Sequence, residues 1–255
     1  MYRASFLLTA TTRLRSIHRQ MSTAAKAPFI LYTEGTPNGK KISVYLEELK
    51  SIYGDKVAYD VEHIALRTGK QKEPWFIDTL NPNGKIPVLV DRNRPSTTGA
   101  EGFAVFETAA ILLYLSQHYD PEHKLWFDLA KQPEDYSEML QWIFFAHGGV
   151  GPMQGQLVYY NKFAPEDVPH AKKRYLEETK RLYSVLEIRL KNRDWLAGPG
   201  TGVYSIADIN VFPWIKGHTF SGIESIDEFP RLKAWFDRIE ARPTVQAGLA
   251  VPKTQ

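Results

Sequence analysis

The segment from Asn81 to Thr108 constrains the fold of this chain more than any other. It reads Asn-Pro-Asn-Gly-Lys-Ile-Pro-Val-Leu-Val-Asp, then a polar loop, then Val-Phe-Glu-Thr. Pro87 precedes a short apolar run that predicts a strand, and proline is tolerated in a sheet only at a strand's first residue or at an edge. A cis bond before Pro87 would turn the N–H and C=O of Ile86 outward, where an extended peptide can pair with them.

Glu107 and Thr108 open the amphipathic run from Ala109 to Gln117, which predicts a helix. The first turn of a helix has unpaired N–H groups and a positive potential, so it binds a carboxylate well. A strand edge, an anion cradle and an adjacent carboxylate together suit a small zwitterionic peptide.

These residues resemble the glutathione-binding half of the cytosolic glutathione transferases, whose N-terminal domain has a thioredoxin-like fold. In that family the proline is cis, the residue before it pairs with the cysteinyl backbone of glutathione, and the Glu-Thr pair holds the γ-glutamyl group. Further motifs are similar to the subgroup of fungal nitrogen-regulator-like transferases and the bacterial Nu class: Thr36-Pro37-Asn38-Gly39-Lys40-Lys41-Ile42, Leu125-Trp126, Gln141-Trp142-Ile143-Phe144-Phe145, Gly151-Pro152-Met153-Gln154-Gly155-Gln156 and Tyr204-Ser205-Ile206-Ala207-Asp208. The resemblance covers the chain from Pro28 to its end.

The order of predicted elements indicates an α/β thioredoxin-like domain at residues 28–119, a linker at 120–134 and an all-helical domain at 135–255. The first domain is expected to hold strands at Phe29–Tyr32, Val57–Ile64, Pro87–Val90 and near Val105, with helices that start at Thr36, Pro74 and Glu107. The second is expected to hold a long helix at 136–163 with a kink at Gly148–Pro152, a helix at 171–191, and a capping box at Ser205–Asp208 that starts a buried helix.

Residues 1–27 contain five basic residues and no acid, so the net charge of +3 belongs to the head of the chain. The nearly neutral remainder has no electrostatic case for binding nucleic acid. The head has the composition of a mitochondrial transit peptide, and the alternative is a disordered extension ahead of a start at Met21. We therefore expect a cytoplasmic protein, or a mitochondrial one if the head is used. No apolar run approaches the about 20 residues that span a bilayer.

The chain has no cysteine. Disulfides, zinc ribbons and a catalytic thiol of the protein's own are thereby excluded, and with them the branches of the resemblance that place a cysteine near Asn38. Sulfur chemistry must use the thiol of the ligand, so glutathione is expected as a co-substrate, and no metal is expected.

The start of the predicted helix at Thr36 is the candidate catalytic element. A free thiol has a pKa of about 8.5, so bound glutathione needs stabilisation as a thiolate. The Asn38 amide and the Thr36 hydroxyl can each donate a hydrogen bond, and one good donor is expected to lower the thiol pKa by about one or two units. Asn38 cannot act as a base. The alternative is that it only caps or turns the loop.

The resemblance implies glutathione contacts for Gln71 and Lys85 at the glycyl end, for Ile86, Pro87, Glu107 and Thr108 as described above, and for Arg174 across a dimer. Gln71 and Lys85 have the alternative of an ordinary solvated loop, and Arg174 lies in a basic cluster typical of a solvated helix face. His147, with Phe144 and Gly151, is expected near the second-substrate cleft, unless it is merely packed or solvated.

The sequence thus predicts a homodimeric glutathione transferase that acts mainly as a glutathione-dependent disulfide reductase. Conjugation of small electrophiles is expected to be weaker, because only neutral donors stabilise the sulfur. The alternative is a non-catalytic protein of the same fold that binds glutathione or another ligand in a regulatory role.

Overall fold

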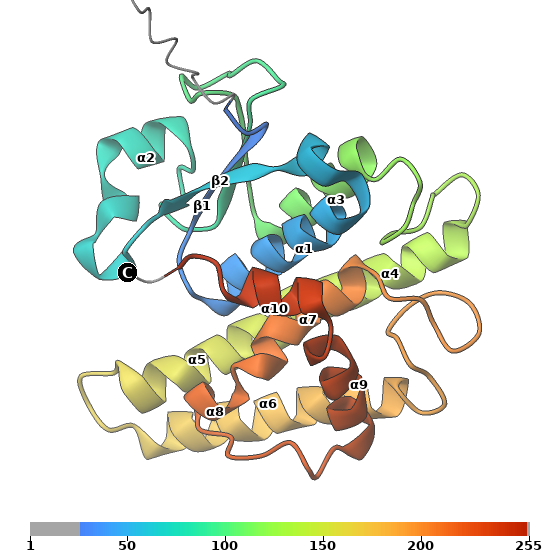
Figure 1. Ribbon diagram of the computed structural model, residues 1–255. Coiled ribbons are helices and arrows are strands. Elements are labelled where there is room, and N and C mark those ends of the chain that lie inside the picture. Colours follow the sequence, from blue (N-terminus) through green and yellow to red (C-terminus); the bar gives the residue numbers. More distant parts are fainter. Residues whose placement is uncertain (1–25, 254–255) are drawn as a thin grey trace, which may run out of the picture.

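The computed structural model describes residues 26–253, which form a small sheet domain packed against a helical domain (Figure 1). The predictions for the basic head and for Met21 lie outside the described residues. Within the described part of the chain, every helix is too short or too polar to cross a lipid bilayer.

The first domain contains a four-stranded mixed sheet in the order β2-β1-β3-β4, as expected for a thioredoxin-like fold. Its strands are β1 (Phe29–Thr33), β2 (Tyr59–His63), β3 (Val88–Asp91) and β4 (Phe103–Phe106), and its helices are α1 (Pro37–Tyr53), α2 (Pro74–Thr79) and α3 (Thr108–Tyr119). β1 runs parallel to β2, which completes the predicted βαβ unit, and antiparallel to β3; β3 runs antiparallel to β4.

Alternation along β1 assigns each face of the sheet to different helices. Phe29 and Leu31 pack in the main core with residues of α1 and α3, whereas Ile30 packs in a second cluster with Phe76 of α2. The α1 helix begins as predicted, with Thr36 as its N-cap and Pro37 in its first turn. This arrangement points the N-termini of α1 and α3 toward the helical domain.

The second strand is shorter than predicted. Val57 ends a 3-10 turn, Gly54–Val57, and β2 begins only at Tyr59. The Ala58 N–H donates to the Asp55 carbonyl within this turn, whereas the Ala58 carbonyl accepts the Phe29 N–H of β1. Val57 is buried nonetheless, because the turn folds it into the core.

The second domain is all helical. It consists of α4 (Pro133–Phe145), a π-helical segment (Ala146–Val150), α5 (Gly151–Lys162), α6 (Pro169–Arg189), α7 (Ile206–Lys216), α8 (His218–Ser221), α9 (Pro230–Glu240) and α10 (Pro243–Leu249). The predicted long helix is therefore interrupted close to the expected place. The interruption is a π-helical segment that starts at Ala146 and continues directly into α5, with Pro152 at the start of α5. Helix α3 ends at Tyr119 and α4 begins at Pro133. The domain boundaries at 119 and 135 stay predictions.

The predicted capping box at the start of α7 is present. The Ser205 side chain accepts the Ala207 N–H, and the Asp208 carboxylate accepts the Ser205 N–H. Asp208 is fully buried and also accepts the indole N–H of Trp235, while burial raises the pKa of its carboxyl to about 6. Its role is to hold α7 in the core.

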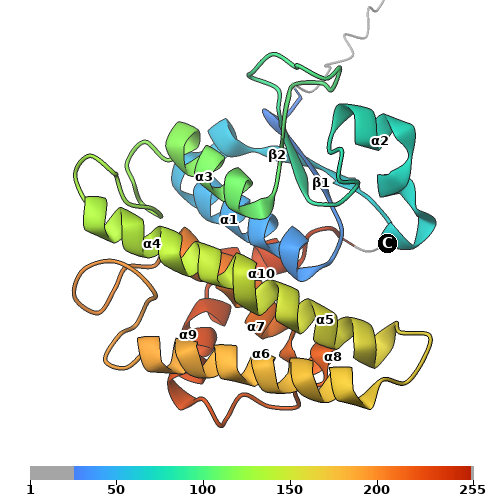
Figure 2. The same ribbon diagram turned by 180° about the vertical axis from the view of Figure 1, so that it is seen from behind.

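Helix α10 ties the two domains together by lying against α1 (Figure 2). The Ser43 hydroxyl donates to the Gly248 carbonyl over 2.7 Å, and the Lys40 ammonium donates to the Leu249 carbonyl over 2.6 Å. A Cβ at Gly248 would lie 2.4 Å from the Cα of Val44, so only glycine permits this contact. The C-terminal helix therefore holds α1, and with it one wall of the site.

Candidate functional site

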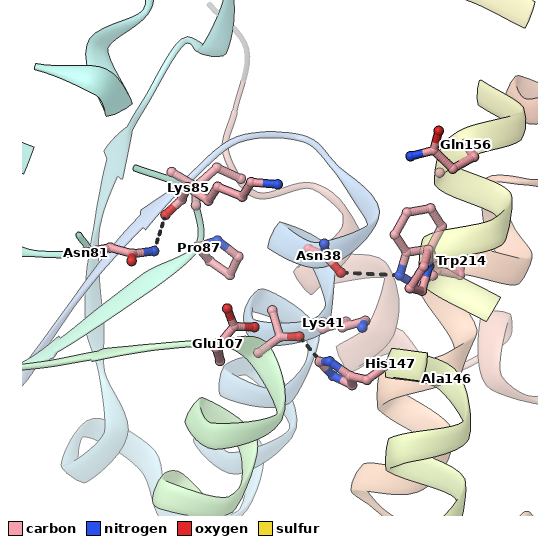
Figure 3. A pocket seen from close by; sticks show the side chains of 15 residues that line it. Asn38, Lys41, Asn81, Lys85, Pro87, Glu107, Ala146, His147, Gln156 and Trp214 are labelled. Atoms are coloured by element: carbon pink, nitrogen blue, oxygen red, sulfur yellow. Dashed lines mark hydrogen bonds between the residues drawn. The ribbon is translucent and has the colours of Figure 1, made fainter. Parts of the chain in front are cut away.

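A cavity of about 410 Å³ lies between the two domains (Figure 3). Its walls come from the start of α1, the turn before β3, the start of α3, the π-helical segment, α5 and the end of α7. The lining residues are Asn38, Lys41, Asn81, Lys85, Ile86, Pro87, Glu107, Thr108, Ala146, His147, Gly151, Pro152, Gly155, Gln156 and Trp214. An adjoining hollow of about 320 Å³ shares Asn38, Lys85, Ile86 and Trp214 and adds Thr36 and Gln71.

At the start of α1, two predicted residues have defined hydrogen bonds. Thr36 has extended backbone angles, and its Oγ1 accepts the Gly39 N–H over 3.2 Å. The Asn38 Oδ1 accepts the indole N–H of Trp214 over 3.2 Å. Trp214 lies in α7, so a residue of the helical domain contacts the side chain that the sequence singles out for the sulfur.

The turn before β3 is organised by a buried asparagine. The Asn81 side chain donates to the Lys85 carbonyl over 2.8 Å and accepts the Asn83 N–H over 2.9 Å. The Ile86–Pro87 bond is cis, as the sequence predicts. The β1–β3 and β3–β4 ladders begin at Val88, so Ile86 lies beyond the paired part of the strand and lines the cavity.

The start of α3 differs from a normal capped helix. Its N-cap residue, Glu107, has φ 68° and ψ 120°, and its side chain caps no N–H of the first turn. The Glu107 side chain is exposed, whereas Thr108 is buried. The first-turn N–H groups of α3 are therefore available to an anionic ligand, as expected from the sequence.

His147 lies beside Thr108 in the cavity wall and belongs to a polar network. Asn210 donates its amide N–H to the Ile143 carbonyl over 3.1 Å, so its Oδ1 is left to accept from the His147 Nε2 at 3.2 Å. The same Nε2 lies 3.3 Å from the Thr108 Oγ1. Burial, followed by the charge of Lys41, lowers the pKa of His147 to about 4, so the imidazole is neutral at pH 7. The network fixes the tautomer that carries its proton on Nε2.

Lys41 is one of the lining residues that sequence reasoning missed, as are Asn81 and Trp214. Lys41 lies one turn after Asn38 on α1, and its side chain is 1% exposed. Burial lowers the pKa of its ammonium to about 7, and the nearby charge of Glu107 opposes that shift. Lys41 makes no ion pair within residues 26–253, so its charge is available to an anion in the cavity. The sequence pattern that could have revealed its burial is spacing. Lys41 precedes Tyr45 by one helical turn, so it lies on the apolar face of α1.

The remaining predicted residues lie at different distances from this cavity. Gln71 faces the adjoining hollow, and its Oε1 is buried with no hydrogen-bond partner among the described residues. Lys85 is exposed at the rim of both hollows. Arg174 lies on α6 in a separate surface hollow with Lys173. Its predicted reach across a dimer stays a prediction, as does the dimer itself. Gly151 lines the cavity as expected, but Phe144 is exposed and does not.

Two protein-family descriptions match this chain. "Glutathione S-transferase, N-terminal domain" matches residues 37–118, and "Glutathione S-transferase, C-terminal domain" matches residues 151–243. Among curated proteins, the Disulfide-bond oxidoreductase YfcG of Escherichia coli is 39% identical over 225 residues, which cover 88% of this chain and 95% of the relative.

Solved structures with the same architecture include two from fungi. A glutathione transferase homolog from Lodderomyces elongisporus, with two GSH per subunit, has a TM-score of 0.78 at 36% identity and covers 88% of this chain and 99% of that chain. The glutathione transferase URE2P8 from Phanerochaete chrysosporium, with oxidized glutathione, has a TM-score of 0.75 at 32% identity and covers 88% of this chain and 95% of that chain.

Proposed function

The chain belongs to the glutathione S-transferase family, and we propose that it binds glutathione between its two domains and uses the thiol to reduce disulfides. One observation carries the proposal. Three features that each suit a different part of a γ-linked tripeptide converge on one cavity: the uncapped start of α3, the unpaired backbone at Ile86 and the amide of Asn38.

In this proposal the γ-glutamyl group occupies the α3 end of the cavity. Its carboxylate binds the first-turn N–H groups of α3 near the Thr108 hydroxyl, and its ammonium pairs with the Glu107 carboxylate. The buried Lys41 supplies the positive charge that pairs with the γ-glutamyl carboxylate.

The rest of the tripeptide continues along the turn before β3. The cysteinyl backbone pairs with Ile86 as an added strand would, and Pro87 shapes that edge. The glycyl carboxylate reaches the adjoining hollow, where Lys85 carries a positive charge. One Nε2 N–H of Gln71 donates to the Leu66 carbonyl over 3.4 Å, and its second N–H is the donor proposed for this carboxylate.

The thiol then faces the start of α1, where Asn38 and Thr36 stabilise the thiolate. A hydrogen bond to a charged acceptor contributes about 1.5–3 kcal/mol, so one donor lowers the thiol pKa by about one or two units. Such a shift brings the pKa near ambient pH, where exchange with disulfides is fastest.

The proposed reaction is thiol–disulfide exchange. The glutathione thiolate attacks one sulfur of a small disulfide, the S–S bond breaks, and the leaving thiolate takes up a proton. A second glutathione thiolate attacks the resulting mixed disulfide, which releases the second thiol and forms glutathione disulfide. Two glutathione molecules thus supply the two electrons that reduce the substrate.

Two of the similar proteins support thiol–disulfide exchange as the chemistry. The Escherichia coli relative is named a disulfide-bond oxidoreductase, and the URE2P8 structure contains oxidized glutathione, the product of such a reaction. We propose that conjugation of electrophiles is the weaker activity, since Asn38 and Thr36 are neutral donors.

The test is turnover of hydroxyethyl disulfide with glutathione, measured for the wild type and for Asn38→Ala. We expect Asn38→Ala to lower the rate at pH 7 by about tenfold, because the thiol pKa of the bound glutathione rises by about one unit or more. Calorimetry should show that glutathione affinity is nearly retained.

The matched control is Asn93→Ala, an exposed asparagine outside the cavity, which should leave turnover unchanged. Glutathione binding with no turnover by the wild type would favour a non-catalytic binding protein instead. Folded protein that binds neither glutathione nor glutathione disulfide would refute the proposal.

A further inference from the structure

Among the described residues, Trp214 makes the one side-chain hydrogen bond from the helical domain to Asn38. The indole Nε1 lies 3.2 Å from the Asn38 Oδ1, and the two residues are 176 positions apart in sequence (Figure 3). Both line the main cavity and the adjoining hollow. Their hydrogen bond therefore crosses from one domain to the other beside the proposed sulfur position.

The chemistry of the two groups determines the orientation of the amide. An indole N–H only donates, so the atom that faces it must be the oxygen of the amide. In Figure 3 the oxygen of Asn38 points at the indole, and the nitrogen points away from it. The amide nitrogen has two N–H groups and donates to no described residue. Its donors are therefore free for a ligand.

Trp214 is itself held by α5 and, through Gln154, by α6. Its carbonyl accepts the Gln154 side-chain N–H over 2.7 Å, and the Gln154 Oε1 accepts the Tyr183 hydroxyl over 2.8 Å. The indole lies against two glycines one turn apart on α5. A Cβ at Gly151 would lie 3.1 Å from the indole Nε1 and 3.2 Å from the Ala146 carbonyl oxygen, and a Cβ at Gly155 would lie 3.5 Å from the indole Cη2. A methyl group at Gly151 would therefore force the indole to move, whereas one at Gly155 would make an ordinary van der Waals contact.

We propose that Trp214 is a positioning residue, which turns the donor end of the Asn38 amide toward the glutathione sulfur. This inference rests on the proposed function, because it needs a thiolate at that place. Without the indole N–H, the amide is free to rotate and present its oxygen, which would repel the thiolate. The helical domain would then control how strongly the first domain acidifies the thiol.

The experiment compares wild type with Trp214→Phe, which removes the N–H and keeps an aromatic ring. The thiolate absorbs in the ultraviolet, so a pH titration of bound glutathione measures its thiol pKa directly. We expect the pKa to rise by about one unit in Trp214→Phe, and the acidic limb of the turnover profile to move by the same amount. Affinity for S-methylglutathione, which has no ionisable thiol, should change less than about twofold.

Trp75→Phe is the control for loss of an indole hydrogen bond. Trp75 donates to the exposed Glu73 carboxylate and lines neither cavity, so its loss should leave the thiol pKa unchanged. Gly151→Ala provides a second test if Trp214→Phe does not fold, because its methyl group presses on the indole Nε1. It should raise the thiol pKa, whereas Gly155→Ala should not.

A wild-type thiol pKa that is lowered, together with the same value in Trp214→Phe, would overturn the role of Trp214 and leave the proposed function intact. A wild-type thiol that titrates like free glutathione would instead overturn the proposed function, and this inference with it. Equal shifts in Gly151→Ala and Gly155→Ala would also count against the role of Trp214.

Discussion

The two helix starts that face the cavity follow opposite rules. At the start of α1, Thr36 has extended backbone angles and its side chain caps the Gly39 N–H. At the start of α3, Glu107 has a φ of 68° and caps nothing. Residues other than glycine rarely adopt such a φ, and a helix without a side-chain cap loses about 1 kcal/mol.

The contrast separates positioning from binding. The satisfied start of α1 holds Asn38 in one place, whereas the unsatisfied start of α3 leaves its N–H groups and a charged side chain to a ligand. Strained and unsatisfied groups tend to gather where a protein binds, because the ligand supplies the missing partner. Stability and function should therefore respond in opposite directions at the two sites.

The largest expected effect concerns the charge near the start of α3 and is tested by Lys41→Met. Burial lowers the pKa of Lys41 to about 7, while an unfolded lysine keeps about 10.4. Below pH 7 both states are protonated and the full cost of burying the charge is present. Removing the amine should therefore raise the free energy of unfolding by about 3–5 kcal/mol at pH 6, measured with urea.

The sign of its pH dependence is a separate check. Between about pH 7 and pH 10 the unfolded wild type binds more protons than the folded wild type. The free energy of unfolding of the wild type should therefore rise with pH relative to that of Lys41→Met. Affinity for S-methylglutathione should fall about tenfold in the variant. Lys50→Met, on the exposed side of α1, should change neither quantity. Unchanged affinity in Lys41→Met would mean that the N–H groups of α3 hold the carboxylate without Lys41.

The second prediction concerns the positive φ and the carboxylate of Glu107 at the start of α3. Glu107→Gly should raise the free energy of unfolding by about 1 kcal/mol, because glycine adopts a positive φ without strain. The same change should weaken glutathione binding about tenfold by removing the carboxylate that pairs with the ligand ammonium. Urea denaturation and calorimetry measure the two effects.

Glu107→Ala separates these causes, since alanine removes the carboxylate and keeps the strain. It should bind glutathione as weakly as Glu107→Gly with no gain in stability. A gain in stability in the alanine variant would show that the backbone at this position is not strained.

The smallest effect is expected at the capped start of α1. Thr36→Ala should lower the free energy of unfolding by about 1 kcal/mol through loss of the cap, and Thr36→Ser should retain it. Calorimetric affinity for S-methylglutathione should stay the same in both. An affinity that falls with the stability of α1 would mean that the two helix starts are coupled.

Local patterns allowed much of this structure to be predicted. The capping box at Ser205, the start of α1 at Thr36 and the cis bond before Pro87 each depend on a few adjacent residues. The interruption near Gly148 was also predictable, although its π-helical form was not. The start of β2 was wrong by two residues, because a 3-10 turn competes with a strand over the same apolar residues.

Lys41 shows how a local signal can be misjudged. As part of a Lys-Lys pair it resembles a solvated charge, yet its spacing from Tyr45 assigns it to the buried face. Packing of α1 against α3 and α7 then determines that the ammonium faces a cavity rather than water.

The sequence by itself determined the family, the helix starts and the absence of a thiol in the protein, since these follow from residue types and short spacings. Only the tertiary structure decided which end of the Asn38 amide is free, because its partner Trp214 lies 176 residues away. It also decided that Lys41 has no counter-ion within the described residues. Hydrogen-bond direction and the burial of charge depend on which distant elements pack together, and no local pattern specifies that.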